Sequence, residues 1–283
     1  MNSRGRNTQL FALPQPPPET VELAGCVYRL VRVFKHDFYA ATCLYETAEA
    51  VDIPRAVVKF GRTQAFCGVP LDWLGRRMRM HEEDIYRALA GLAGVPRWAG
   101  GLDDATYAIE YIDAVPLDHL DTPPAGFFDR LLDLFGAVHA RGVAYSDANK
   151  RSNILVDDAG EPFLIDYQIS FRRRDDWPWP FRNLLAAAVR YIQRADLYHV
   201  YKHKRRLSPD EMTPMERDLS RRRGPLHRLH RKLTKPYRSL RRRFLRDQYR
   251  AGRLKSPTAN LEDHDQPEKA TWRTREAPSE ENP

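Results

Sequence analysis

The sequence predicts an α+β fold of two unequal lobes, the first rich in strands and the second mostly helical. Its 283 residues suffice for one two-lobed domain, or for two small domains, with a sizeable core. Up to about residue 112, β-branched and aromatic runs dominate, with one helical pattern among them. Apolar residues at helical spacing dominate residues 113–210. Strands and helices segregated along a chain in this way are typical of α+β proteins.

The first lobe, residues 21–112, is predicted to hold a small antiparallel sheet and one helix. β-branched and aromatic residues mark strands at 27–33, 38–45, 55–60 and 106–111. Residues 34–37 predict the turn between the first two strands. An apolar face that includes Ile85 and Leu89 predicts a helix over residues 73–92.

The second lobe, residues 113–210, is predicted to be mostly helical. The expected elements are helices over residues 127–142, 181–204 and much of 210–250, and short strands over 153–156 and 162–165. Gly142 is a usual helix stop. Residues 157–160, with the sequence DDAG, predict the turn between the two strands.

The two ends of the chain are predicted to be disordered, because residues 1–20 are polar and rich in proline and residues 256–283 are charged without apolar periodicity. The start contains no apolar core of signal-peptide length. No apolar run approaches the roughly 18 residues that a spanning helix needs. The three cysteines show no CxxC spacing, which favours reduced packing residues. We therefore expect a cytoplasmic protein, free or peripheral at the inner membrane face.

The motif that carries most chemistry lies at residues 142–170, with the sequence GVAYSDANKRSNILVDDAGEPFLIDYQIS. Two short apolar strands place Asp147, Asn153 and Asp166 at one end of a hairpin. Phosphoryl transfer needs such a set, because one carboxylate orients the attacking hydroxyl while a carboxylate and an amide oxygen hold Mg²⁺. The alternative is a polar turn region with incidental Asp and Asn.

A second motif, AVVKF at residues 56–60, places Lys59 in an apolar strand. A buried ammonium needs an anion, and the following helix offers Glu82 and Glu83. A strand lysine paired with a helix glutamate can hold nucleotide phosphates. The alternative is an edge-strand lysine whose ammonium reaches solvent.

These motifs resemble those of the protein-kinase superfamily over about residues 25–205, which implies a two-lobed protein-kinase-like fold. AVVKF resembles the strand that carries the family's lysine, and AIEYI at 108–112 resembles the hinge. YSDANKRSN at 145–153 resembles the catalytic loop, and DYQ at 166–168 resembles the metal-binding DFG motif.

The resemblance also implies roles for residues and for cofactors. Lys59, oriented by Glu82, would hold the phosphates of ATP, and the backbone of Glu110 and Ile112 would bind adenine. The catalytic loop would supply Asp147 as the base and Lys150 for the γ-phosphate. Asn153 and Asp166 would bind Mg²⁺, with Mn²⁺ as an alternative.

Four departures from the family pattern stand out. The first hairpin turn has no glycine-rich loop, so Lys35 or backbone amides would have to cover the phosphates. Tyr145 and Ser146 replace His-Arg, which argues against regulation by activation-loop phosphorylation. Asp147 and Asn153 are separated by one residue more than usual, so the loop must bulge. No APE motif follows.

The sequence most resembles the group of bacterial kinases that phosphorylate Kdo and heptose sugars of the lipopolysaccharide core. The stretches HDFYAATCLYE, GVPLDWLG and VPRWAG carry this resemblance, together with DYQIS. It implies an ATP-dependent kinase whose acceptor is the hydroxyl of a lipid-linked sugar. An atypical Ser/Thr protein kinase and a nucleotide-binding pseudokinase scaffold are the alternatives.

Basic residues concentrate in residues 217–255, within a predicted helical extension at 211–255. This stretch has sixteen Lys and Arg against two acids, a net +14, so the rest of the chain carries −6 of the total of +8. Two hypotheses follow: binding to an anionic membrane surface, or packing of its apolar stripe on the second lobe. Nucleic acid is disfavoured because no recognition motif is present.

Two tryptophans in the stretch DDWPWPF, Trp177 and Trp179, follow the last motif. They could cap the cleft or hold a sugar ring. A packed loop stiffened by proline is the interpretation that we favour.

Overall fold

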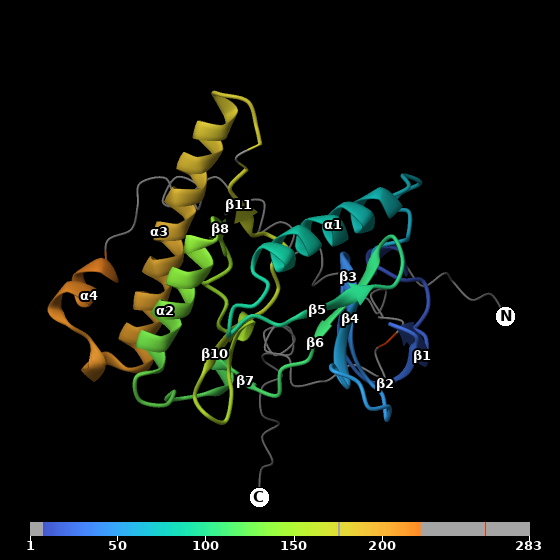
Figure 1. Ribbon diagram of the computed structural model, residues 1–283, viewed down its shortest axis with the longest axis horizontal. Coiled ribbons are helices and arrows are strands. Elements are labelled where there is room, and N and C mark those ends of the chain that lie inside the picture. The colour runs from blue at the N-terminus through green and yellow to red at the C-terminus, as the bar shows by residue number, and fades with distance from the viewer. Residues whose placement is uncertain (1–7, 175, 222–257, 259–283) are drawn as a thin grey trace, which may run out of the picture.

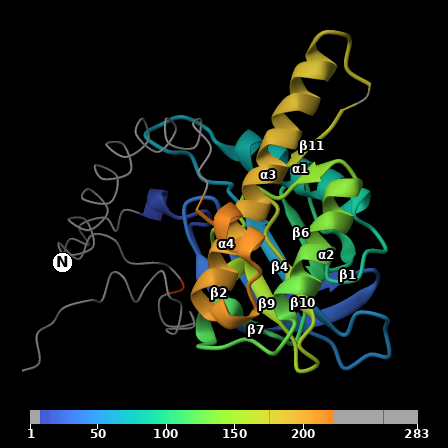
Figure 2. The ribbon, with the colours of Figure 1, turned by 90° about the vertical axis from the view of Figure 1, so that its left-hand side faces the viewer.

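The computed structural model describes residues 8–174, 176–221 and 258. It has the expected α+β architecture, with an antiparallel sheet and one helix in the first lobe and helices in the second (Figure 1). In Figure 2, turned by 90°, the helices of the second lobe face the viewer and lie in front of the sheet.

The first lobe is a six-stranded antiparallel sheet in the order β1-β2-β3-β4-β6-β5. Its strands are β1 (Thr20–Leu23), β2 (Cys26–His36), β3 (Ala40–Glu46), β4 (Arg55–Gly61), β5 (Trp98–Gly101) and β6 (Thr106–Glu110). The helix α1 (Asp72–Ala88) packs against β4, β5 and β6. The four predicted strands are confirmed as β2, β3, β4 and β6.

The turn after β2 lies later than predicted. Residues 34–36 continue the strand, and the chain reverses at Asp37, whose Oδ1 accepts hydrogen bonds from the amides of Tyr39 (2.7 Å) and Ala40 (3.0 Å). An aspartate that caps backbone amides in this way favours a turn at its own position.

The helix α1 ends four residues earlier than predicted. Its last turn closes at Leu89, and Gly91 follows with a φ of 80°, which turns the chain out of the helix. Leu89 is nevertheless fully buried, so the predicted apolar face is confirmed although the predicted end of the helix is wrong.

Residues 8–20 are ordered against the sheet, contrary to the disorder that their composition predicts. They begin with a short 3-10 helix, η1 (Thr8–Leu10), and Phe11 is buried. The reason is Arg62, a fully buried side chain that donates to the carbonyls of Gln9 (2.6 Å), Phe11 (3.1 Å) and Phe38 (2.9 Å). Carbonyls from several segments satisfy the guanidinium and hold those segments together.

The helix α1 approaches β4 so closely that only glycine fits at the contact. A Cβ on Gly75 would lie 2.5 Å from the carbonyl oxygen of Arg62, the residue after β4, and one on Gly61 would lie 3.2 Å from Gly75 Cα. This contact sets the position of the helix that carries Glu82.

The second lobe contains α2 (Phe127–Ala140), α3 (Phe181–Leu207) and α4 (Pro214–Leu219), which confirms the predicted helices before residue 220. Short strands form a three-stranded sheet and a pair: β7 (Val115–Pro116), β8 (Val143–Ala144), β9 (Ile154–Val156), β10 (Pro162–Leu164) and β11 (Phe171–Arg172). Three 3-10 turns complete the lobe: η2 (Leu117–His119), η3 (Arg151–Asn153) and η4 (Pro209–Glu211). Residues 222–255 of the basic segment lie outside the described residues.

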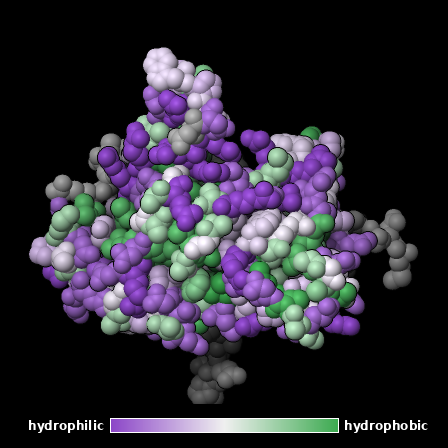
Figure 3. Space-filling model, viewed as in Figure 1, coloured by the Kyte–Doolittle hydropathy of each residue, from purple (hydrophilic) through white to green (hydrophobic). Residues whose placement is uncertain are grey.

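The two lobes share one core. Buried residues of α1 and β6, such as Ile85 and Ile109, pack in the same cluster as Leu131 and Phe135 of α2. A second cluster, which includes Val33 and Val58, lies within the sheet. The shared cluster fixes α1 relative to the second lobe, and the first end of α3 projects beyond that body (Figures 1 and 3). None of the described helices is long and apolar enough to cross a membrane.

Candidate active site

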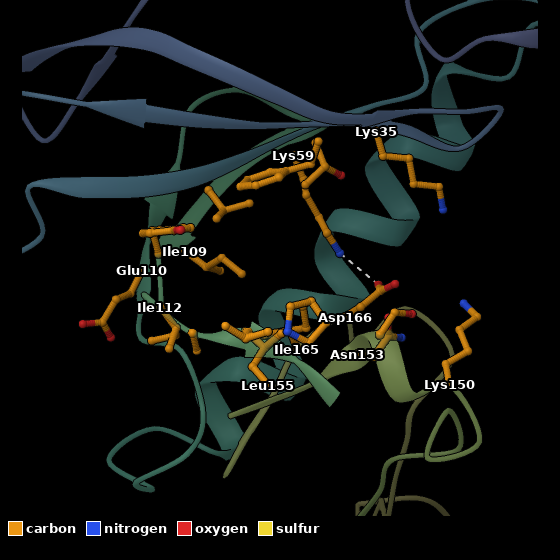
Figure 4. A pocket seen from close by; sticks show the side chains of 18 of the residues that line it. Lys35, Lys59, Ile109, Glu110, Ile112, Lys150, Asn153, Leu155, Ile165 and Asp166 are labelled. Carbon is orange, nitrogen blue, oxygen red and sulfur yellow. Dashed lines mark hydrogen bonds and ion pairs between the residues drawn. The ribbon is translucent and has the colours of Figure 1, made fainter. Parts of the chain in front are cut away.

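A cavity of about 540 Å³ lies between the sheet and the second lobe, within the usual size range of small-molecule sites. Apolar side chains line one part of it: Val57, Ile109, Ile112, Leu155 and Ile165. Polar side chains line the other: Lys35, Lys59, Lys150, Asn153 and Asp166 (Figure 4). An apolar slot beside a cluster of cations and oxygen ligands suits a nucleotide, with its base in the slot and its phosphates at the cluster.

Lys59 is buried at the polar end, on a strand in the interior of the sheet. Its Nζ lies 3.0 Å from Glu82 Oε2 and 3.0 Å from Asp166 Oδ1. The edge-strand alternative is therefore wrong, because β4 has neighbours on both sides and the ammonium is paired. Burial alone would lower the pKa of Lys59, but Asp166 and Glu82 together raise it well above the ordinary value. Lys59 is thus held as a cation.

Asp166 follows β10 in a left-handed conformation with a φ of 63°, which Asp tolerates better than most residues. Burial works against its charge, yet Lys59 and the more distant Lys150 and Lys35 hold its pKa below the ordinary value. A carboxylate that stays ionised at the mouth of a buried pocket can serve as a metal ligand.

The predicted catalytic loop, residues 145–153, brings Asp147 and Asn153 together despite its extra residue. Asn153 Nδ2 donates to Asp147 Oδ2 at 2.9 Å, and Lys150 Nζ lies 2.9 Å from the same oxygen. The chain between Asp147 and Asn153 includes the 3-10 turn η3. Because the amide nitrogen of Asn153 is directed to Asp147, its oxygen is the atom left for a cation.

Asp196, on α3, holds the predicted catalytic loop, and no motif in the sequence indicates this role. Its carboxylate accepts from the backbone amides of Tyr145 (2.8 Å) and Ser146 (2.9 Å) and from His139 Nε2 (3.2 Å). Burial raises the pKa of Asp196, against these hydrogen bonds. The sequence does contain an indication of this role: Asp196 lies within the apolar stripe of a predicted helix, and a buried acid needs hydrogen-bond partners.

Tyr145, which replaces the histidine of the family pattern, links the loop to the strand end before Asp166. Its hydroxyl donates to the carbonyl of Ile165. Its ring packs edge-on against Tyr167 at 5.2 Å between centroids, and Tyr167 packs against Tyr86 of α1 at 5.1 Å. A column of three tyrosines therefore connects α1, the Asp166 segment and the catalytic loop.

The other predicted ligand residues lie at the rim of the cavity. Lys35 pairs with Asp37 at 2.8 Å, at the turn that stands where the family has its glycine-rich loop. Glu110 points away from the cavity and pairs with Arg97 at 3.0 Å, so only its backbone faces the slot (Figure 4). Adenine contacts by the backbone of Glu110 and Ile112 stay a prediction.

The donor set fits Mg²⁺ when phosphate is present. No cluster of three or more His, Cys, Asp or Glu side chains suited to a metal occurs among the residues that the structure describes. The oxygens of Asp166 and Asn153 are hard ligands, and Mg²⁺ commonly binds one or two carboxylates together with substrate phosphates. These two residues would therefore hold the ion jointly with a nucleotide.

Comparisons with known proteins give matches of structure alone. No family model and no curated protein matches the chain. The Rio2 kinase from Chaetomium thermophilum aligns with a TM-score of 0.47 and 17% identity, over 67% of this chain and 61% of the Rio2 chain. Its ADP/Mg²⁺-phosphoaspartate complex aligns with a TM-score of 0.46 and 16% identity over the same shares.

These likenesses are too distant to indicate an activity, and the chain spans less than two thirds of the Rio2 chain. The architecture is plain from the elements themselves. An antiparallel sheet with one helix, a helical second lobe and a polar cavity between them make this a protein-kinase-like fold.

Proposed function

We propose that the protein is an ATP- and Mg²⁺-dependent phosphotransferase that acts on a hydroxyl group. One observation carries the proposal. The buried ion pairs of Lys59 with Glu82 and Asp166 lie at the same end of one cavity as Asn153, which is hydrogen-bonded to Asp147. Phosphoryl transfer is catalysed mainly by positioning and electrostatic stabilisation, and this arrangement supplies both.

Each residue has a role that follows from its position. Lys59 binds the phosphates near the apolar slot, and Glu82 keeps the ammonium in place. Asn153 and Asp166 would hold Mg²⁺, which neutralises phosphate charge when it is bound. Asp147 orients the acceptor hydroxyl and takes its proton. Lys150 is partly exposed, so it can reach the γ-phosphate by leaving Asp147.

The acceptor that we propose is a lipid-linked sugar of the lipopolysaccharide type. The resemblance of three stretches outside the catalytic loop to kinases of the lipopolysaccharide core supports it. The segment between Asp166 and α3 is short, and its strand β11 pairs with β8, which leaves little room for a peptide platform. That geometry favours a small acceptor over a protein.

A nucleotide-binding pseudokinase is the second candidate. The turn that would cover the phosphates has no glycine, and Asp37 stands in it, with its carboxylate paired to Lys35. Backbone amides are thereby less available for phosphate than in a glycine-rich loop. Such a protein would bind ATP without transferring its phosphate.

The test is a transfer assay with the purified full chain, γ-labelled ATP and Mg²⁺. Lipopolysaccharide core fragments, membrane lipids and generic proteins are offered separately. Label on the sugar fragments supports the full proposal, whereas label on proteins identifies a protein kinase. Binding of ATP without label on any acceptor favours the pseudokinase.

A further inference from the structure

The projecting end of α3 and the stretch before it form an exposed apolar tip, residues 176–188. The exposed fractions are 48% for Trp177, 73% for Trp179, 59% for Phe181 and 71% for Leu184. Figures 1 and 2 show this end standing clear of both lobes. The sequence interpretation of a packed loop is therefore wrong. Leaving four large apolar side chains in water is unfavourable, and such clusters mark interaction surfaces.

The base of the tip is fixed to the body. His81 Nε2 donates to the Ser170 carbonyl at 3.0 Å, and Asp84 pairs with Arg172 (2.6 Å) and Arg174 (3.1 Å). These three interactions connect residues 170–174, which precede the tip, to α1 on one side. On the other side, the rest of α3 packs against α2 and β8. Phe181 and Leu184 belong to α3, so they cannot fold back onto the lobe without unwinding that helix.

The residue pattern of the tip is amphipathic. Its helical part has apolar side chains at i, i+3, i+4 and i+7, namely Phe181, Leu184, Leu185 and Ala188. The same helix carries exposed arginines at positions 182, 190 and 194, and the tip contains one exposed acid, Asp176. In Figure 3 the end of the projection is pale and green, with strongly hydrophilic residues below it.

This composition fits the interface of an anionic bilayer. Tryptophan is enriched at the level of lipid headgroups, and basic side chains near an apolar helical face favour anionic lipids. A second copy of the chain fits less well, because a stable dimer buries about 800 Å² on each partner. A narrow convex projection can bury little area against another folded protein, whereas a fluid lipid bilayer can surround it.

We propose that the tip inserts Trp177, Trp179, Phe181 and Leu184 into the interfacial region of an anionic membrane, while Arg182 and Arg190 contact lipid phosphates. The interaction is separate from the nucleotide site, since the cavity contains no residue of the tip. It also involves none of the residues 217–255. The proposal does not depend on the acceptor being a lipid-linked sugar. Membrane binding through the tip would, however, bring the active site close to a membrane-bound acceptor.

The experiment is co-sedimentation of the full chain with phosphatidylcholine vesicles, with and without phosphatidylglycerol. The parent should bind the anionic vesicles, and the triple variant Trp179→Ser/Phe181→Ser/Leu184→Ser should bind them at least about tenfold more weakly. The matched control is Val69→Ser/Met215→Ser, which replaces apolar side chains that are 56% and 72% exposed elsewhere. It should bind like the parent.

A second measurement separates insertion from attraction by charge alone. Brominated phosphatidylcholine in the vesicles should quench the tryptophan fluorescence of the parent. The variant Trp177→Phe/Trp179→Phe keeps the apolar surface, so it should bind normally but lose most of the quenching.

Three results would overturn the proposal. They are no vesicle binding by the parent, equal binding by the triple variant, or unchanged quenching without the two tryptophans. A change from dimer to monomer in the triple variant, with vesicle binding unaltered, would assign the surface to a second copy instead. Binding of MgATP should be the same in all variants, so each of these results leaves the phosphotransferase proposal standing.

Discussion

At the scale of single residues, the site depends on a few buried charges, and the sequence located most of them. Lys59, Glu82 and Asp166 were predicted from motif order, and in the structure both carboxylates contact the Lys59 ammonium. The role of Asp196 could not be predicted from a motif. Its function arises only when α3 packs behind the catalytic loop, which is a tertiary contact across 50 residues of chain.

Replacement of Asp166 by alanine should abolish Mg²⁺-dependent binding of ATP. Lys59 keeps Glu82 as a partner in this variant, so the protein should still fold, while the metal loses its carboxylate. Thermal-shift measurements with ATP in Mg²⁺ or in chelator provide the test. Asp176→Ala, a change of an exposed acid in the segment that follows, should respond to MgATP like the parent. An equal Mg²⁺-dependent shift in Asp166→Ala would remove Asp166 from the metal site.

At the scale of elements, periodicity and β-propensity predicted the types of element, but contacts set their limits. β5, with the sequence WAGG, has little strand propensity and exists because it pairs with β6. Residues 8–20 look disordered by composition, but the buried guanidinium of Arg62 orders their first part. Neither effect is visible in a local window of sequence, because the stabilising partner lies tens of residues away.

The contact between α1 and β4 should tolerate no side chain at Gly75. Gly75→Ala places a Cβ against the backbone of Arg62, so we expect a loss of about 1–3 kcal/mol, the usual cost of overpacking. Gly136→Ala is the matched control, since it lies within α2 with nothing within 4 Å of the added Cβ. That change should stabilise by about 0.5–1 kcal/mol. Urea unfolding of both variants tests this, and equal midpoints would contradict the close contact.

At the scale of the whole molecule, stability should fall in mild acid because two histidines are buried in the neutral state. Burial lowers the pKa of His36 and of His203 from 6.5 to about 4 each. His36 accepts from the Leu13 amide and donates to Thr258 Oγ1, and His203 donates to the Ala148 carbonyl. The unfolded chain therefore binds more protons than the folded one between pH 6.5 and pH 4.

The sign of this effect follows from linkage. Stability is full above pH 6.5 and declines as the pH falls toward 4, by about 3 kcal/mol for each histidine. Urea midpoints measured across this range should decrease with acid in the parent and less steeply in His36→Gln/His203→Gln. If the urea midpoint of the parent does not change with pH, burial does not lower the pKa of either histidine.

The central claim, that this protein-kinase-like fold transfers phosphate with Asp147 as its base, is tested most directly by comparing the parent with Asp147→Asn. Both the turnover of labelled MgATP with the accepted substrate and the affinity for MgATP are measured. The substitution keeps the size of the side chain and removes its basicity. We predict that affinity stays near that of the parent while turnover falls roughly 10²-fold or more, the scale of a lost general base. Turnover that stays near the parent value would contradict the claim.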